Sequence, residues 1–325
     1  MRLLTRRSLL GTLGALSLAK AGFARQSAWP GALVMGTGQP GGAFTIFGPA
    51  WGRLITQATG VRIVYAATGG SSSNLLLIEE GQAQLGLCSL PLAIQAHNGT
   101  GDWTAGAKLE RFRVLFPTFP SILQIVSTVH GVSTLAELEG QPIGVGPADA
   151  SSPKLVKTAL ASLGIAPSRI EEGRYTHQLA RLLNGELAAC AFFGAPPVPA
   201  LRVVASSNRL RLIGFSEAEA TQAARFVPGL TRMILKAETF PGQTTDVGSI
   251  GTQDLAIGAV TLPDSLVAAA TRAALLHRAQ LAAIVPAASQ PLPLDQIRAA
   301  GLPLHAGAAK ALRQLGYRVP DGAVS

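Results

Sequence analysis

Two glycine-rich turns near the start of the chain have the residue types and spacing to bind a small anion. They lie within ALVMGTGQPGGAFTIFGPAWGRL (residues 32–54) and VRIVYAATGGSSSNLLLIEEG (residues 61–81). In each, a short apolar run ends at glycines and a helical pattern follows. The start of a helix carries unpaired N–H groups and the positive end of the helix dipole, so it attracts anions. The two turns therefore predict a pocket for a carboxylate, and they do not by themselves indicate catalysis.

The candidate ligand-binding residues of these turns combine backbone amides with small polar side chains. They are Thr37, Gly41, Gly42, Phe44, Thr68, Gly69, Gly70, Ser71 and Asn74. We expect the N–H groups of Thr37, Gly41 and Gly42 to face the ligand and Phe44 to form a wall of the pocket. Ser71 either caps its helix or holds the carboxylate, and both interpretations remain open.

A third turn of the same kind lies halfway along the chain, in PIGVGPADASSP (residues 142–153). Ser152 followed by Pro153 is a favourable helix start. Gly146, Ser151 and Ser152 are therefore candidates to close on the ligand from a second lobe, although a merely well-capped helix explains the pattern too. Phe193 ends a later strand and is either a core residue or a ligand contact.

The motifs of nucleotide-binding proteins and hydrolases are incomplete or missing. GTGQPG (residues 36–41) fits G-x-G-x-x-G, but a dinucleotide site also needs an acid at the end of the second strand. The nearest acids, Glu79 and Glu80, fall inside the next helix. The sequence has no Walker motif, no G-x-S-x-G, and no pair of histidines at metal-binding spacing. We therefore predict no catalytic residue, no metal and no cofactor, and expect a binding protein.

The first 24 residues have the pattern of an export signal. Arg6 and Arg7 precede a weakly apolar run, Leu9 to Leu18, which favours a twin-arginine signal peptide, with a Sec signal as the alternative. No later segment offers about 20 apolar residues in a row. The remaining chain is therefore expected to be soluble and periplasmic.

The net charge of the chain is mildly positive. Loss of the signal, which carries four basic residues and no acidic ones, lowers it from +9 to +5. Basic residues are scattered, and aromatic residues make up 5% of the chain, so nucleic acid is not an expected partner.

Past residue 27 the sequence alternates short apolar strands with amphipathic helices, which predicts an α/β fold with mainly parallel sheets. The expected strands cover residues 32–35, 61–66, 85–88, 113–117, 123–128, 142–145, 170–175, 189–193 and 210–214. The expected helices cover residues 45–59, 73–80, 134–138, 152–163, 177–184 and 263–281. Cys88 and Cys190 lie in apolar runs, and we favour buried free thiols over a disulfide.

The ordered series of motifs resembles the TAXI receptors, the solute-binding proteins of one branch of TRAP transporters. The matching segments are GTGQPGGAF with Gly48, ATGGS with Asn74, EGQA (80–83), LAELEGQPIGVG (135–146), LNGELAACAFFGAPP (183–197), FPGQ (240–243) and LPLHAGA (302–308). The resemblance implies a two-lobed periplasmic-binding-protein-like fold with the ligand in the cleft between the lobes. The first lobe would combine residues 28–120 and 236–325, and the second would cover residues 121–235.

The resemblance also implies a function: an extracytoplasmic receptor, expected to be a monomer, that passes a small organic anion, a carboxylate or amino acid, to the permease subunits of a TRAP transporter. The chain departs from the family pattern at Phe44, where tyrosine is usual, and at Gln84, Leu90 and Pro91, where polar residues are usual. These departures favour a less polar carboxylate than glutamate. Two alternatives remain open: a receptor for a membrane sensor kinase, and an exported hydrolase or isomerase.

Overall fold

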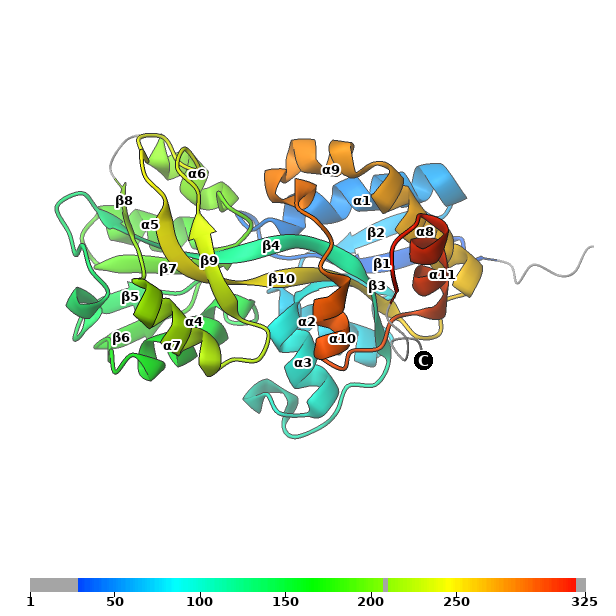
Figure 1. The fold of residues 1–325 in the computed structure, drawn as a ribbon, viewed down its shortest axis with the longest axis horizontal. Helices are drawn as coiled ribbons and strands as arrows, with labels where there is room; N and C mark the ends of the chain where they lie inside the picture. Colours follow the sequence, from blue (N-terminus) through cyan, green and yellow to red (C-terminus); the bar gives the residue numbers. More distant parts are fainter. Residues whose placement is uncertain (1–28, 207–209, 320–325) are drawn as a thin grey trace, which may run out of the picture.

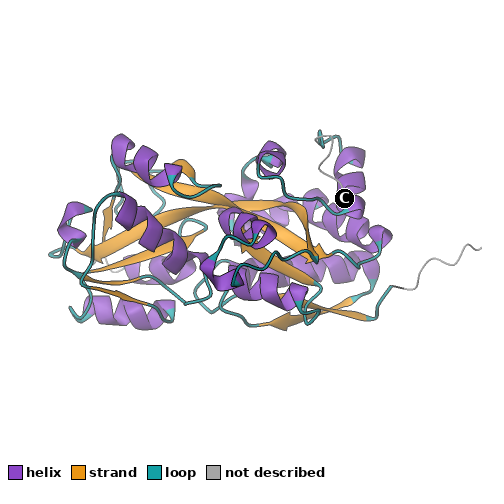
Figure 2. Cartoon of the chain, turned by 90° about the horizontal axis from the view of Figure 1, so that it is seen from below, coloured by secondary structure: helices purple, strands orange, loops and turns teal. Residues whose placement is uncertain are grey.

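The computed structural model describes residues 29–206 and 210–319, so the predicted signal peptide, residues 1–24, lies outside the described residues. The chain forms two lobes, and the long strands β4 (Phe112–Thr128) and β10 (Val247–Ala259) run from one into the other (Figure 1). Helices cover both faces of the strands in each lobe (Figure 2). In the described ranges, no helix is both long enough and apolar enough to cross a bilayer.

The other strands are short. They are β1 (Ala32–Gly36), β2 (Arg62–Ala66), β3 (Leu85–Ser89), β5 (Pro142–Gly144), β6 (Arg169–Glu171), β7 (Ala189–Gly194), β8 (Leu210–Ile213) and β9 (Thr231–Leu235). The α-helices are α1 (Phe44–Thr59), α2 (Ser71–Glu79), α3 (Leu90–Asn98), α4 (Ser151–Ser162), α5 (Tyr175–Leu183), α6 (Pro199–Ala205), α7 (Glu217–Arg225), α8 (Asp264–Leu276), α9 (Arg278–Ile284), α10 (Leu294–Ala299) and α11 (Ala306–Gln314). Single 3₁₀ turns are η1 (Asp102–Thr104), η2 (Ala136–Leu138) and η3 (Pro286–Ser289).

The strands of the described residues form one curled sheet in the order β2-β1-β3-β10-β4-β7-β5-β6, with β8 beside β4 and β9 beside β10. Neighbouring strands are parallel at both ends of this order. In the middle, β10 runs antiparallel to its neighbours β3 and β4, and β4 runs antiparallel to its neighbours β10 and β7. The sheet is therefore mixed, whereas mainly parallel pairing was expected. The reason is that the two strands that pass through both lobes run in opposite directions: β10 pairs antiparallel with β3 in the first lobe, and β4 pairs antiparallel with β7 in the second.

The strand β4 was expected as two strands, 113–117 and 123–128, because Pro117 and Pro120 interrupt its apolar pattern. In the structure it is continuous, and the register with β10 shifts between Gln253 and Leu255, opposite the two prolines. A bulge is one of the few places in a sheet interior where proline is tolerated. The expected helix over 263–281 is likewise two helices, α8 and α9, which meet at His277.

Aromatic contacts mark the core of each lobe. Trp51 of α1 packs edge-on against Phe116 of β4, with ring centroids 5.3 Å apart. In the second lobe Tyr175 packs edge-on against Phe192 at 4.9 Å. Phe240 belongs to the apolar cluster of Tyr175 and Phe192. The segment around Phe240 thus packs on the second lobe, whereas a return to the first lobe at residue 236 was expected. The chain re-enters the first lobe only along β10.

Candidate functional site

A cavity of about 490 Å³, including its open mouth, lies between the lobes where α1, α2 and α4 begin. Its floor is formed by Ser121 of β4 and Asp254 of β10. Seven predicted site residues line it: Gly42, Phe44, Gly69, Gly70, Ser71, Ser151 and Phe193.

The three helix starts present unpaired donors at the cavity. The first residues of α1, α2 and α4 are Phe44, Ser71 and Ser151, and all three line it. Among the described residues, their N–H groups donate to no protein acceptor. No lysine, arginine or histidine of the described part lines the cavity. In the described lining, the groups that can attract an anion are therefore backbone amides and helix dipoles.

The amides expected from the first turn are largely used within the protein. The N–H and the hydroxyl of Thr37 both donate to the carbonyl of Ala66 at 3.0 Å, and Thr37 does not line the cavity. The N–H of Gly42 donates to Gln39 at 3.2 Å. The expectation that Thr37 and Gly42 offer these N–H groups to the ligand is therefore wrong, because the turn consumes them. Gly41 contacts the other lobe through its carbonyl, which accepts from the N–H of Ala200 at 3.1 Å.

Asn74 and Thr68 lie behind the cavity and hold its two glycine turns together. The Asn74 amide donates to the carbonyls of Thr37 at 2.8 Å and Leu87 at 2.7 Å, and Thr68 donates to its oxygen at 2.8 Å. Asn74 is fully buried and neither residue lines the cavity. A Cβ at Gly36 would lie 2.3 Å from the Asn74 oxygen, so the glycine makes room for this side chain. Asn74 is thus a positioning residue instead of the predicted ligand contact.

Ser71 reaches the cavity and also ties two elements together. Its Oγ accepts from the N–H of Ser89 at the end of β3 at 3.0 Å, and it makes no capping hydrogen bond to its own helix. The capping interpretation is therefore wrong. The hydroxyl proton of Ser71 has no acceptor among the described residues, which leaves it available to a ligand.

In the second lobe, Ser152 and Gly146 support the third turn from behind the cavity. The hydroxyl of Ser152 accepts from the N–H of Phe193 at 2.6 Å and so positions that cavity residue. The N–H of Gly146 donates to the side chain of Gln178 at 2.8 Å, whose amide donates to the carbonyl of Glu171 at 2.7 Å. Both residues were predicted as ligand contacts, and both instead hold the turn in place.

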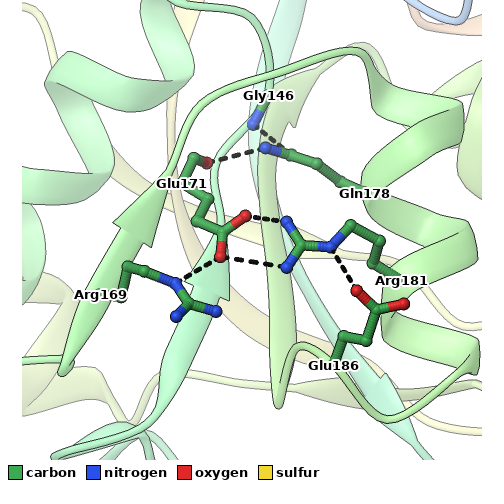
Figure 3. Close-up of polar contacts among 6 residues, drawn as sticks. All are labelled: Gly146, Arg169, Glu171, Gln178, Arg181 and Glu186. Carbon is green, nitrogen blue, oxygen red and sulfur yellow. Dashed lines mark hydrogen bonds and ion pairs between the residues drawn. The ribbon is translucent and has the colours of Figure 1, made fainter.

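An ion-pair cluster anchors this support. Figure 3 shows the carboxylate of Glu171 between Arg169 and Arg181, with Arg181 also 2.8 Å from Glu186. Hydrogen bonds from Arg181 lower the pKa of Glu171 below its ordinary value. Because Gln178 bonds the backbone of Glu171, the cluster fixes the strand end that holds Gly146 (Figure 3).

Sequence reasoning missed Asp254, Ser121, Tyr175 and Gln39, which line the cavity. Asp254 is 2% exposed, and the Ser121 hydroxyl donates to its Oδ2. Burial raises the pKa of Asp254 to about 8. Burial, followed by the nearby Asp254, raises the pKa of Tyr175 as well. The signal in the sequence was a single acid within SIGTQDLAIGA, a run with no other charged residue.

The lobes touch directly across the cleft. The N–H and hydroxyl of Ser72 both donate to the carbonyl of Asp149, at 3.2 and 2.9 Å. A Cβ built on Gly69 would lie 2.3 Å from the Asp149 Cβ. Only a residue without a side chain allows this approach.

Of the departures from the TAXI pattern, only Phe44 lines the cavity. Leu90 and Pro91 are buried at the start of α3, and Gln84 accepts from the N–H of Val34 at 3.0 Å. These three positions therefore do not bear on ligand polarity.

The cysteines are buried and free, Cys88 in β3 and Cys190 in β7, as the prediction favoured. Burial raises the pKa of both thiols. Among the described residues, no three His, Cys, Asp or Glu side chains cluster as a metal site.

Comparison with known proteins places this geometry in a family and a fold. A model of the NMT1-like family matches residues 35–316. The fold is shared with a periplasmic transporter at 12% identity, a TM-score of 0.58 and coverage of 89% of this chain and 98% of the other. It is also shared with the periplasmic binding protein BugD at 10% identity, a TM-score of 0.58 and coverage of 89% and 99%. A protein from Bordetella bronchiseptica RB50 matches at 14% identity, a TM-score of 0.52 and coverage of 90% and 91%. The predicted two-lobed periplasmic-binding-protein-like fold is thereby confirmed.

Proposed function

We propose that this chain, which belongs to the NMT1-like family, is an extracytoplasmic receptor that captures a small organic anion, a carboxylate or amino acid, between its lobes. One observation carries the proposal: three helix starts with unpaired N–H groups, two in one lobe and one in the other, meet at a single cavity. A carboxylate there replaces water as the acceptor of these donors and joins the lobes.

The electrostatics of the cavity suit a carboxylate of modest charge. Each helix start stabilises a nearby negative charge by about 0.3–1 kcal/mol at the surface and up to about 2 kcal/mol when partly buried. Three starts together hold one carboxylate well, while a second carboxylate would need a cation that the described lining does not contain. The Phe44 and Phe193 side chains fit an apolar body. We therefore favour a monocarboxylate.

A receptor is favoured over an exported hydrolase or isomerase. Ser71, Ser121 and Ser151 line the cavity, but the only titratable side chains beside them in the described lining are Asp254 and Tyr175. A serine nucleophile needs a base that accepts its proton near neutral pH, and histidine is the usual choice. Capture without chemistry requires none of these groups.

The partner that we propose is the permease of a TRAP-type transporter, and export by the twin-arginine route fits the arginine pair near the N-terminus. The periplasmic transporter and the periplasmic binding protein that share the fold support a transport role. Closure around ligand changes the surface that both lobes present to such a partner. Delivery to a membrane sensor kinase is the second candidate, and the genes beside this one distinguish the two.

The test is a thermal-shift screen against amino acids, keto acids, and aliphatic and aromatic monocarboxylates, with mass spectrometry of the recovered ligand. A ligand at a hundred times its dissociation constant adds about 2.7 kcal/mol of stability. We expect a hit that is recovered unchanged, whereas a chemically altered hit would contradict a receptor.

The anion site is tested separately by Ser71→Asp, which places a negative charge in the cavity and should abolish binding of the hit. The matched control is Ser73→Asp, which adds the same charge to the same helix outside the cavity lining. Equal affinity of wild type and Ser71→Asp in calorimetry would refute the anion site.

A further inference from the structure

The cavity contains one carboxyl group of its own, at the place where an anion is expected. Asp254 is 2% exposed on the middle of β10 and lines the cavity. Its Oδ2 accepts from Ser121, and its Oδ1 has no hydrogen-bond partner among the described residues. Two negative charges in one buried cavity repel strongly, because little solvent screens them. An anionic ligand and an ionised Asp254 therefore exclude each other.

We propose that Asp254 binds the ligand as a neutral carboxylic acid that donates its proton in a hydrogen bond to the ligand carboxylate, so that anion and proton are captured together. The inference rests on the proposed function, capture of a carboxylate. The Ser121 hydroxyl holds Oδ2 and leaves Oδ1 for this contact. When Asp254 is already protonated, no proton is exchanged. When it is ionised in the free receptor, one proton enters from solvent with the ligand.

The surroundings of Asp254 support a neutral form. Burial raises its pKa to about 8. Cys88 of β3 and Tyr175 of α5 are titratable groups that interact with Asp254: after burial, Asp254 contributes to raising the pKa of both, so both stay neutral near pH 7. In the register of β10, Arg113 of β4 lies opposite Gly258 and Arg232 of β9 opposite Ile250, each four residues from Asp254.

The helices that pack against β10 add no charged group to the described cavity lining around Asp254. Helices α2, α3 and α7 pack on the strand, but none places a charged side chain in the described cavity lining. No cation is therefore at hand to hold Asp254 in its ionised form.

The test measures affinity between pH 6 and pH 9 by calorimetry. The probes are two series of acids that differ only at C2: isovalerate, 3-methyl-2-oxobutanoate and L-valine, and glutarate, 2-oxoglutarate and L-glutamate. We expect isovalerate and 3-methyl-2-oxobutanoate to bind better than L-valine and better than the dicarboxylate series, with affinity nearly constant up to pH 7 and about tenfold weaker at pH 9. Asp254→Asn keeps a donor of similar shape, so we expect it to bind within threefold of wild type at pH 7 and to lose the pH dependence.

The opposite pattern would overturn the inference. If the amino acids bind best, if Asp254→Asn abolishes their binding, and if affinity is constant or rises with pH, Asp254 is an ionised partner of the ligand ammonium group. Thermal unfolding of Asp254→Asn verifies that the variant is folded.

An infrared measurement separates failure of the inference from failure of the proposed function. The carbonyl stretch of a buried carboxylic acid should be present at pH 6 in wild type, disappear toward pH 9 and be absent from Asp254→Asn. If probes bind but this band is missing, the neutral-acid inference alone fails. If the band is present and no carboxylate binds, the proposed function fails, and the capture role of Asp254 with it.

Discussion

Replacement of Asn74 by alanine tests whether the two glycine turns depend on one buried side chain. The variant removes two donors to the backbone carbonyls of Thr37 and Leu87 and the acceptor of the Thr68 hydroxyl. A buried polar group left without its partner costs about 1–3 kcal/mol. The Thr68 hydroxyl, which loses its Asn74 acceptor, lies 3.2 Å from the Thr37 carbonyl and can donate to it instead, so this carbonyl loses less than that of Leu87. We therefore expect Asn74→Ala to lower the free energy of unfolding by about 2–5 kcal/mol.

Urea unfolding followed by tryptophan fluorescence measures this loss as a shift of the midpoint at constant slope. Asn98→Ala is the control, because Asn98 is an exposed asparagine at the end of α3 whose loss should change stability by less than about 0.5 kcal/mol. Asn74→Asp keeps the shape but turns a carboxylate toward two carbonyl oxygens, so it should be at least as damaging as alanine. A loss below 1 kcal/mol for Asn74→Ala would refute the positioning role.

Two further predictions concern lobe closure and pH. Gly69→Ala should weaken ligand binding at least tenfold and prevent the ligand-dependent decrease in the radius of gyration in X-ray scattering, because its Cβ would collide with Asp149. The control is Gly31→Ala, whose Cβ meets nothing within 4 Å and which should bind like wild type. Normal closure of Gly69→Ala would contradict the role given to this contact. Burial raises the pKa of Asp254 to about 8 in the folded state, against about 3.9 in the unfolded state. Between these two pH values the folded state binds the proton and the unfolded state does not. The stability that this group contributes is therefore complete below about pH 4 and is lost as pH rises through 8. Urea unfolding at pH 5, 7 and 9 should show wild type losing up to several kcal/mol relative to Asp254→Asn, and parallel pH curves for the two proteins would count against a buried neutral acid.

The sequence predicted the elements that carry the turns because their pattern is local. Apolar runs that end in glycine identified β1, β2 and β5, and the helices after them begin within two residues of the predicted positions. The predicted cavity residues Gly42, Phe44, Gly69, Gly70, Ser71, Ser151 and Phe193 all belong to such turns or strand ends. Thr37, Asn74, Gly146 and Ser152 lie in the same segments but behind the cavity. Which side of a turn faces the ligand depends on hydrogen bonds to distant residues such as Ala66 and Gln178.

The strand β10 was not predicted, and the reason concerns the site itself. Its sequence VGSIGTQDLAIGA contains three glycines and the polar run TQD, which do not match the alternation of a half-buried strand. It is buried along most of its length, and Asp254 faces a cavity. Glycine and aspartate have low strand propensity, so the local signal is weak at the residue of this strand that lines the site.

Contacts between the lobes set how much the ligand must contribute to closure. Among the described residues, three hydrogen bonds already cross the cleft, two from Ser72 to Asp149 and one from Ala200 to Gly41. Each is worth about 0.5–1.5 kcal/mol net. The ligand therefore adds to a closed state that the protein already stabilises in part, and its differential affinity for that state determines how far the population shifts. Gly69 and Gly70 take part in both ligand binding and lobe closure, because they line the cavity and also allow Asp149 and Ala150 of the other lobe to approach. Substitutions at these glycines should therefore change closure and ligand affinity together, whereas Asp254→Asn should change the pH dependence of affinity and leave closure intact.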